Sequence, residues 1–389
     1  MNALKANEHT TRRRFLNSLF WSVYFFLPIR RSYVNALETG RDVVEDSLDR
    51  LASRQNEDGS FGVSSELFGR DPAVAALSGL AFLAAGSFPG RGRYGDVLSK
   101  IVSYVGNCSF KVNKQQTGFV GVDRSYEQIV DDYLNDNNLE AKQIDGLIAN
   151  LRENGRKPLY GHGYSTLFLA EIFGTTNDQS IRDKIKNAID LIVRTQNAEG
   201  GWRYTPSAVP LADISVTVCQ LSALRSCENA GIYVPSNTVA RAAAYIRSLQ
   251  NSDGGFRYMT AEGPSGYGRT AAAIHALQSS GTDYEVEIQR GFEYLENVYP
   301  TVADTIQRNN MIEYWTYAQF YATLAYWRAA TTNSAQTKWN DFSRRVRQDL
   351  LARRSEDGLW NSNISTEVET SFALCALLTF RENSPLFLR

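Results

Sequence analysis

Two kinds of helical pattern alternate along this chain. In the first, apolar residues recur every three or four positions among charged ones, as in the segments 181–192 and 239–249. This spacing predicts an amphipathic helix with one buried face. In the second, nearly every position is apolar or small, which predicts a helix surrounded by other helices. The second pattern occurs at 73–85, 165–173, 216–224, 270–277, 317–327 and 370–378.

A short phrase links each amphipathic segment to the apolar one after it. It has the form Gln-Asn-x-Asp/Glu-Gly-x-aromatic and occurs at 55–61, 196–202 and 250–256, with a degenerate copy at 354–360. We expect the acidic residue and the glycine to end the first helix in a left-handed turn. The aromatic residue, Trp202 in one copy, should fold back as a hydrophobic plug.

The phrase repeats with a period of a little over fifty residues. Gly200 and Gly254 are 54 positions apart, and Gly254 and Gly358 are 104 apart, or two units of 52. These units predict an all-α fold, an α/α toroid of about six helical hairpins with the apolar helices inside. Closure gives every hairpin two neighbours, and an open solenoid is the alternative.

The phrase and its period resemble the QW repeat of squalene cyclases and protein prenyltransferase β-subunits, which fold as α/α toroids. The chain is still more similar to bacterial exported proteins called prenyltransferase/squalene oxidase repeat proteins. The likeness runs from about Arg41 to Arg389, and it implies the toroid fold without a defined reaction. The segments that carry it are 160–163, 167–171, 200–204, 213–220 and 385–389.

Residues 37–389 are predicted to form this toroid as a single domain, because six hairpins need roughly 300 residues. An insertion near 121–158 is rich in acidic residues among Asn and Lys. It is interpreted as a solvated excursion, and an acidic metal-binding loop is the alternative. The acidic residues are Asp131, Asp132, Asp136, Glu140 and Asp145.

Residues 1–36 are predicted to be a twin-arginine export signal. The stretch 11–17 contains three consecutive arginines, a short apolar run follows at 19–29, and 34–36 offers small residues for cleavage. The apolar run is too short for a bilayer, which takes about 20 residues. The sequence therefore predicts an exported, periplasmic protein with no membrane span after cleavage; a retained anchor is the alternative.

Charge and cysteine content narrow the candidate partners. The chain has 41 Lys and Arg against 42 Asp and Glu, and loss of the basic signal makes the remainder more acidic, so no nucleic-acid binding is expected. Cys219 and Cys227 are eight residues apart, about 12 Å on one helix, which is beyond disulfide reach. Buried free thiols are expected, and a disulfide to Cys108 is the alternative.

Squalene cyclases are similar at the start of one inner helix, where they have Asp-x-Asp-Asp-Thr and a carboxylic acid that protonates an alkene. The corresponding stretch here is Asp213-Ile214-Ser215-Val216-Thr217. Ser215 takes the place of the proton donor, and a hydroxyl group cannot protonate an isolated alkene. The resemblance therefore does not imply the cyclisation mechanism.

Protein prenyltransferases resemble one another in an Asp-x-Cys pair and a His that bind catalytic zinc. No Cys in this chain follows an Asp at that spacing, and only His162 and His275 remain after signal removal. We therefore expect no metal site of this kind and no cofactor. His275 lies in an Ala-rich segment and is interpreted as a core histidine.

Aligning the inner helices on one another brings polar residues from distant repeats to one rim. The alignment predicts a ligand site at this mouth. His162 and Asp213 are the candidate catalytic residues, His162 as a general acid–base or an orienting group. The alternatives are that His162 caps or bridges the entry of its helix and that Asp213 is an N-cap. The predicted ligand-binding residues are Tyr160, His162, Asp213, Thr217, Tyr267, Arg269, Tyr314 and Tyr317.

Aromatic residues in the fifth repeat extend this prediction. Tyr314, Tyr317 and Tyr321 are three and four positions apart, so they should share one helix face. Such a wall suits an isoprenoid or a sugar ring, and ordinary packing between helices is the alternative. Tyr204 and Tyr258 could complete it.

Two function classes follow. In the first, the toroid is a binding or scaffolding module for an amphipathic ligand, an isoprenoid or other lipid being one candidate, or for a protein partner. In the second, it is an enzyme that uses His162 in acid–base chemistry on an unknown substrate. A central cavity filled by side chains from the inner helices would argue against enclosure of a small molecule in both classes.

Overall fold

The computed structural model describes residues 43–62, 70–110, 119–120, 158–206, 208–309, 314–330, 333–362 and 365–380. The chain divides into two compact units, Met1–Val43 and Val44–Arg389, and the elements below belong to the second. The predicted export signal, most of the 121–158 insertion and the 385–389 segment lie outside the described residues. No helix among the described residues is long and apolar enough to cross a membrane.

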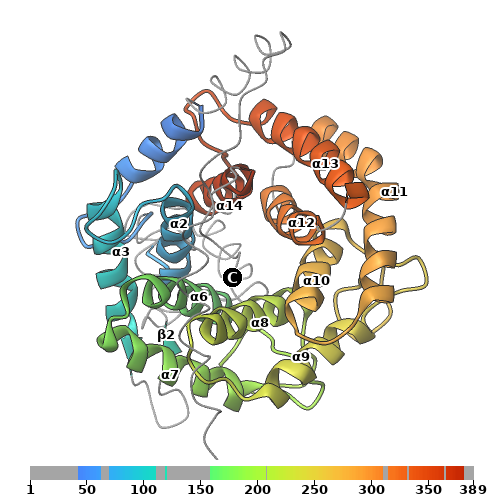
Figure 1. Cartoon of the computed structure of the whole chain (residues 1–389), viewed down its shortest axis with the longest axis horizontal. Helices are drawn as coiled ribbons and strands as arrows, with labels where there is room; N and C mark the ends of the chain where they lie inside the picture. The colour runs from blue at the N-terminus through green and yellow to red at the C-terminus, as the bar shows by residue number, and fades with distance from the viewer. Residues whose placement is uncertain are drawn as a thin grey trace, which may run out of the picture. The chain divides into compact units, whose positions relative to one another are not determined.

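Six inner helices follow one another around a ring (Figure 1). Each packs against the next, and the last packs against the first, so the ring is closed. The closed ring confirms the predicted toroid over the open solenoid. The inner helices are α2 (Pro72–Ala84), α6 (Pro158–Thr176), α8 (Ile214–Asn229), α10 (Tyr267–Ser279), α12 (Trp315–Ala329) and α14 (Thr366–Thr379).

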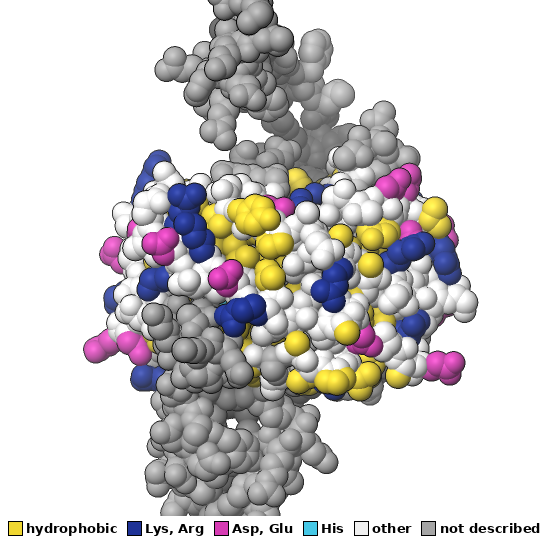
Figure 2. Space-filling view, turned by 90° about the horizontal axis from the view of Figure 1, so that it is seen from below, with side chains coloured by type: hydrophobic (Ala, Val, Ile, Leu, Met, Phe, Trp, Pro, Cys, Tyr) yellow, Lys and Arg dark blue, Asp and Glu magenta, His cyan; other side chains and the backbone are white. Residues whose placement is uncertain are grey.

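An outer helix precedes each inner helix, and its polar face is turned to the outside of the ring. Figure 2 shows part of this outer wall, where basic and acidic side chains are interspersed with small apolar patches. A two-residue antiparallel ladder joins β1 (Ser109–Phe110) to β2 (Phe119–Val120). The outer helices are one described over residues 43–53, α3 (Gly95–Asn107), α7 (Gln179–Thr195), α9 (Ser236–Ser248), α11 (Glu285–Asn309) and α13 (Asn333–Ala352).

The repeated phrase forms the turn from outer to inner helix in four of the hairpins. The glycine after the acidic residue has a positive φ, 97° at Gly200 and 86° at Gly254. A Cβ at Gly254 would lie 2.5 Å from the main-chain oxygen of Arg290 in the next outer helix. Glycine is therefore required both by the left-handed backbone and by this close approach.

The glutamine of the phrase joins its turn to the following outer helix. The Gln196 side chain donates from Nε2 to the main-chain oxygens of Gly200 (2.7 Å) and of Thr238 in α9 (2.9 Å). Gln250 makes the same pair of bonds to Gly254 and to Glu287 in α11. These two repeats are thus tied to their neighbours through side-chain amides whose donors are both used.

The aromatic residue of the phrase is a buried plug, as predicted. Trp202 is 1% exposed, and its indole N–H donates to the main-chain oxygen of Ile192 in α7 (2.8 Å). Its main-chain N–H donates to the hydroxyl of Thr217 in α8 (3.1 Å). The plug therefore fixes the inner helix against the outer one through both packing and hydrogen bonds.

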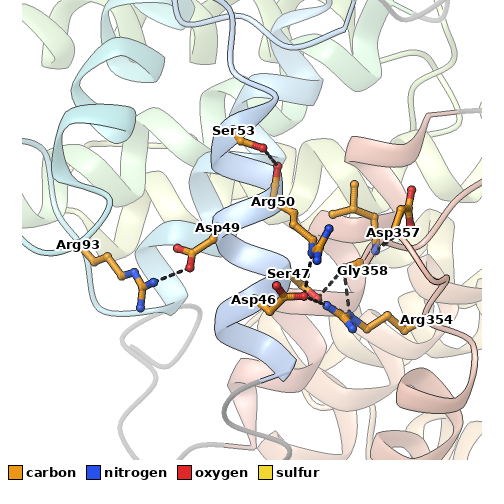
Figure 3. A network of polar contacts seen from close by, with 10 residues as sticks. Asp46, Ser47, Asp49, Arg50, Ser53, Arg93, Arg354, Asp357 and Gly358 are labelled. Atoms are coloured by element: carbon orange, nitrogen blue, oxygen red, sulfur yellow. Dashed lines mark hydrogen bonds and ion pairs between the residues drawn. The ribbon is translucent and has the colours of Figure 1, made fainter.

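The degenerate fourth phrase closes the ring (Figure 3). Arg354 stands where the other copies have glutamine, and its Nε donates to the main-chain oxygen of Gly358 and to the Ser47 hydroxyl in the first outer helix. It also forms an ion pair with Asp46. Ser47 in turn donates to the Gly358 oxygen at 2.8 Å. A cation thus makes the contact between the sixth and first hairpins that a neutral amide makes elsewhere.

Candidate functional site

The amino-terminal ends of the inner helices meet at one mouth of the ring, and the orientation of α6 fixes which side chains face its lumen. A Cβ at Gly161 would touch Asp71 beside α2, whereas a Cβ at Gly163 would touch Cys219 in α8. The lumen lies between these two neighbours. Since residues on a helix are 100° apart, Tyr160 and Tyr164 point into the lumen and the residue two positions after Tyr160 points away from it.

His162 is accordingly buried between the inner and outer layers, and not at the rim where the sequence alignment placed it. It is completely inaccessible to solvent, and its Nε2 lies 3.2 Å from the main-chain oxygen of Ala188 in α7. Burial lowers the pKa of His162 to about 4, although the bond to Ala188 opposes this shift. The imidazole is therefore neutral near pH 7 and out of reach of a ligand in the lumen.

Thr217 and Tyr267 also turn away from the lumen. The Thr217 hydroxyl binds the plug at Trp202 and donates to the main-chain oxygen of Asp213 (2.7 Å). The Tyr267 ring stacks on Trp315 at 5.7 Å and contacts Tyr299 at 5.8 Å. Both side chains hold the inner helices against the outer layer, which the alignment of helix starts could not reveal.

Tyr314 does not share the helix face predicted for it. It precedes α12 with a φ of 62° and is 63% exposed. The other two tyrosines of that stripe do face the lumen together, since the rings of Tyr317 and Tyr321 meet edge to face at 4.8 Å.

Asp213 is the N-cap of α8. Its Oδ1 accepts from the main-chain N–H of Val216 at 2.9 Å, and its own N–H donates to the main-chain oxygen of Trp202. The residue is completely buried. This geometry agrees with the N-cap alternative. The carboxylate lies close below the tyrosines of the mouth, and after burial it is the largest contribution that raises the pKa of Tyr160.

Four tyrosines gather at the mouth above Asp213. Tyr204 and Tyr258 follow the second and third plugs by two residues, and their hydroxyl groups are hydrogen-bonded to each other. The ring of Tyr160 lies 6.3 Å from that of Tyr204. Tyr317 approaches from α12, where burial and then the nearby Ser215 hydroxyl act on its pKa in opposite directions, with a net rise.

Main-chain bonds fix the two loops that carry Tyr204 and Tyr258. The N–H of Leu159 in α6 donates to the oxygen of Tyr204, and the N–H of Ile214 in α8 donates to the oxygen of Tyr258, both at 3.0 Å. Each loop thereby covers the amino-terminal end of an inner helix. We refer to Tyr160, Tyr204, Tyr258, Tyr317, Ser215 and Arg269 as the tyrosine mouth.

Two arginines border the tyrosine mouth. The Arg203 guanidinium lies 5.2 Å from the centre of the Tyr204 ring. Arg269, partly exposed at the start of α10, donates to the main-chain oxygen of Pro264 at 3.0 Å, and its charge opposes the rise that burial causes in the pKa of Tyr317. The mouth therefore combines aromatic faces with positive charge at the amino-terminal ends of several helices.

The lumen below the mouth is crossed by side chains. Tyr164 of α6 and Tyr321 of α12 come from opposite sides of the ring, and their hydroxyl oxygens are 3.3 Å apart. Phe372 of α14 packs edge to face against both Tyr164 and Tyr317. All three bridging rings are at most 6% exposed. A ligand in the mouth would rest on this floor.

Two buried carboxylates escaped the sequence analysis. Glu367 and Glu369 lie in the first turn of α14 and are 3% and 2% exposed. Glu367 pairs with Arg54 at 2.6 Å, and Glu369 accepts a hydrogen bond from Thr316. Their place inside an otherwise apolar inner helix is the signal that could have identified them.

Possible metal ligands and cysteines can be located in the described part of the chain. There, no group of three or more His, Cys, Asp and Glu side chains lies close enough together to hold a metal ion. All four cysteines are free thiols, and Cys219 and Cys227 both lie on α8. The expected free thiols are thus confirmed, although Cys108 is only partly buried.

Parts of the sequence are similar to enzymes that act on terpenes. Residues 164–331 match the family model of the squalene-hopene cyclase C-terminal domain. A stretch of 88 residues is 35% identical to drimenyl diphosphate synthase from Streptantibioticus cattleyicolor. That stretch is 23% of this chain and only 16% of the relative's length.

Solved structures with the same fold include enzymes of different classes. The type II terpene cyclase MstE from Scytonema is similar with a TM-score of 0.52 and 12% identity, over 88% of this chain and 98% of that chain. Cellobiose 2-epimerase from Spirochaeta thermophila is similar with a TM-score of 0.54 and 13% identity, over 88% and 97%. At such identities the structures establish the fold alone. The chain thus shares the toroid fold with these enzymes, and residues 164–331 are similar to the squalene-hopene cyclase C-terminal domain.

Proposed function

We propose that this toroid is a binding module whose tyrosine mouth holds an amphipathic ligand of the isoprenoid class. The ligand's apolar part lies on the tyrosine rings, and its polar head meets the tyrosine hydroxyls, Arg203 and Arg269. The observation that carries the proposal is the convergence of residues from α6, α8, α10, α12 and two plug loops on one partly exposed site above a closed floor.

The chemistry of the tyrosine mouth supports a ligand with two unlike ends. Tyrosine rings offer apolar contact area, and their hydroxyl groups offer directed hydrogen bonds. Within the described residues the buried Nε of Arg269 has no hydrogen-bond partner, and a buried polar group without a partner is costly. Helix amino-terminal ends and two arginines favour a negatively charged head such as a phosphate.

The Tyr164–Tyr321 bridge limits how the ligand is held. A long isoprenoid chain enclosed along the ring axis would have to displace this hydrogen-bonded pair and the Phe372 ring packed against it. We therefore assign to the mouth a head group and the first part of a chain, with the remainder outside. The family model of the squalene-hopene cyclase C-terminal domain and the drimenyl diphosphate synthase that are similar in sequence support the isoprenoid class.

A catalytic role centred on His162 receives no support from this geometry. The side chain bonds to α7, faces away from the tyrosine mouth, and has a pKa of about 4. A general acid–base group must be within hydrogen-bond reach of its substrate. Binding without acid–base chemistry at His162 is therefore the function proposed.

Export belongs to the same proposal. The twin-arginine pattern in residues 1–36 would deliver the folded ring to the periplasm, where amphipathic isoprenoid lipids and protein partners are both accessible. A protein partner that receives the ligand at the mouth is compatible with the exposed ends of the plug loops.

Native mass spectrometry tests the proposal. Protein purified from its own host should retain a lipid, and the delipidated protein should bind farnesyl phosphate. Arg269→Gln and Tyr317→Phe should weaken that binding at least tenfold, because they remove the head-group charge and a hydroxyl. Tyr233→Phe is the matched control, since Tyr233 is 83% exposed and lies after α8, away from the mouth. Equal binding by all variants would refute the assignment.

A further inference from the structure

A second group of polar side chains lies on the other side of the Tyr164–Tyr321 bridge, toward the carboxyl ends of the inner helices. It consists of Ser222, Arg225, His275, Gln278, Tyr321 and Arg328, which we call the lower lumen cluster. These residues come from α8, α10 and α12. The tyrosine mouth does not include them, and the turns that hold the ring together make no use of them.

The positions of Ser222 and Arg225 show that the cluster faces the lumen. α8 and α12 are separated by α10 in the ring. A hydrogen bond from the Ser222 hydroxyl nevertheless opposes the rise that burial causes in the pKa of Tyr321, and the Arg225 charge adds to the effect of burial in lowering the pKa of Arg328. The His275 ring lies 5.7 Å from the Tyr321 ring. Side chains of non-adjacent helices can approach in this way only through the centre of the ring.

Several polar atoms of the cluster are buried without a hydrogen-bond partner. Within the part of the chain that the structure describes, these atoms are Arg225 Nε, His275 Nδ1 and Gln278 Oε1. His275 is 7% exposed. Buried polar groups are paired in the great majority of cases, so three such atoms in one place need an explanation. A ligand that is part of the working protein provides it.

The unmet groups indicate the chemistry of that ligand. Gln278 Oε1 is an amide oxygen and can only accept; the amide's Nε2 donates to the main-chain oxygen of Ala325 (3.1 Å). Arg225 Nε can only donate, whereas Ser222 can do both. Burial and then the Arg328 charge lower the pKa of His275 to about 3, so its imidazole is neutral and can donate or accept. A ligand that forms hydrogen bonds with these groups must both donate and accept.

The charge around the cluster favours a neutral ligand. Arg225 is paired with Glu228. Arg328 lies in the last turn of α12, where the main-chain oxygens of helix carboxyl ends carry partial negative charge. The positive and negative charges around the cluster therefore offset one another. At the tyrosine mouth, in contrast, the arginines and the helix amino-terminal ends are both positive. Hydroxyl groups donate and accept without charge, and the faces of His275 and Tyr321 offer an aromatic surface to a ring.

We propose that the lower lumen cluster is a second ligand site, which takes a neutral hydroxyl-rich ring such as a sugar residue. It is separated from the tyrosine mouth by the Tyr164–Tyr321 bridge, and it does not depend on the function proposed for that mouth. The two sites bind opposite kinds of molecule at opposite ends of one lumen.

The test uses the two core histidines as reporters in protein that carries no substitution. Protein lacking residues 1–36 and labelled with ¹³C-histidine should give two ring signals, His162 and His275, because the only other histidine is His9. Glucose, mannose and cellobiose are added separately at millimolar concentrations. At least one should shift the His275 signal in a saturable way and leave His162 unmoved, since His162 lies behind α6. No shift with any of the three, or equal shifts of both signals, overturns the proposal.

Variants give a second readout. Ser222→Ala should weaken the binding of the sugar at least tenfold while the melting temperature stays close to that of the parent, because a single hydroxyl group that faces the lumen is removed. Ser215→Ala, seven residues earlier on the same helix but at the tyrosine mouth, should change sugar binding less than twofold. Inorganic diphosphate should not shift His275. Binding of diphosphate in place of all three sugars, or unchanged sugar binding by Ser222→Ala, would contradict the site.

Discussion

Polar groups in the repeated turns and in the lumen differ in how fully they are hydrogen-bonded. In the turns, Gln196 uses both amide hydrogens, Thr217 both donates and accepts, and the Trp202 indole bonds to Ile192. In the lumen, His275 Nδ1 and Gln278 Oε1 are buried without partners among the described residues. The polar groups named in these turns are thus satisfied within the ring. Polar groups left over in the lumen are therefore the ones to consider for ligands.

Removing a plug should give the largest effect and tests the structural half of this comparison. Trp202→Ala should lower the free energy of unfolding by about 3 to 5 kcal/mol, because it leaves a cavity and removes a buried hydrogen bond. Urea unfolding followed by circular dichroism measures this. A loss below about 1 kcal/mol would mean that the plugs do not hold the two helical layers together.

Mild acid should destabilise the ring through its buried histidines. Burial takes the pKa of His162 from its ordinary value of 6.5 to about 4 in the folded protein, so the unfolded chain binds the proton more readily. The stability contributed by the neutral ring is therefore fully present above pH 6.5 and is lost as the pH falls toward 4. Between pH 7 and pH 5 the loss should be about 2 kcal/mol for this residue. His162→Gln should show a shallower dependence in urea titrations, and an unchanged slope would contradict the assigned burial.

A turn glycine should be less tolerant than a glycine of the same conformation elsewhere. Gly254→Ala should cost about 1 to 3 kcal/mol from its left-handed backbone, with an additional cost from the contact with Arg290. Gly281→Ala is the control, since Gly281 has a φ of 78° and a Cβ added there would meet no heavy atom within 4 Å. Thermal melting of the two variants should differ clearly, and equal losses would show that the close approach is unimportant.

Opening the closure between the first and last hairpins should have the smallest effect on stability. Arg354→Gln restores the residue found in the other phrases but removes the ion pair with Asp46, which is nearly half exposed. Exposed ion pairs contribute about 0 to 1 kcal/mol. Because hydrogen bonds from Arg50 and Arg354 lower the pKa of Asp46, this contribution is present above the carboxyl's ordinary pKa and disappears as acid protonates it. A loss in urea unfolding that is equal at pH 7 and pH 3 would contradict this role.

The sequence predicted the ring and its plugs because each repeat carries the same local signals. Helix periodicity, the turn glycine and the aromatic plug are properties of short segments, and their recurrence implies the closed architecture. The direction of single side chains at the mouth was predicted less well. Two positions along a helix differ by 200° in direction, so Ser215 faces the lumen and Thr217 does not. An error of two positions in aligning the inner helices therefore selects side chains on the wrong face.

The other side chains of the mouth show the same limit. Tyr160, Arg269 and Tyr317 do come together near Asp213, as the alignment of repeats predicted, whereas His162 and Tyr267 turn to the outer layer. Unpartnered atoms such as His275 Nδ1 depend on which neighbours a residue meets across the ring. No local pattern contains that information. The role of the mouth residues in binding stays a prediction.

Photo-crosslinking tests the central claim most directly. A farnesyl phosphate that carries a diazirine on its first isoprene unit is bound to the mature protein, irradiated, and located by peptide mapping. The account predicts labels on peptides that contain Tyr160, Tyr204 or Tyr258, and their loss in Arg269→Gln. Labels confined to the carboxyl ends of the inner helices, or spread over the outer wall, would contradict a ligand site at the tyrosine mouth.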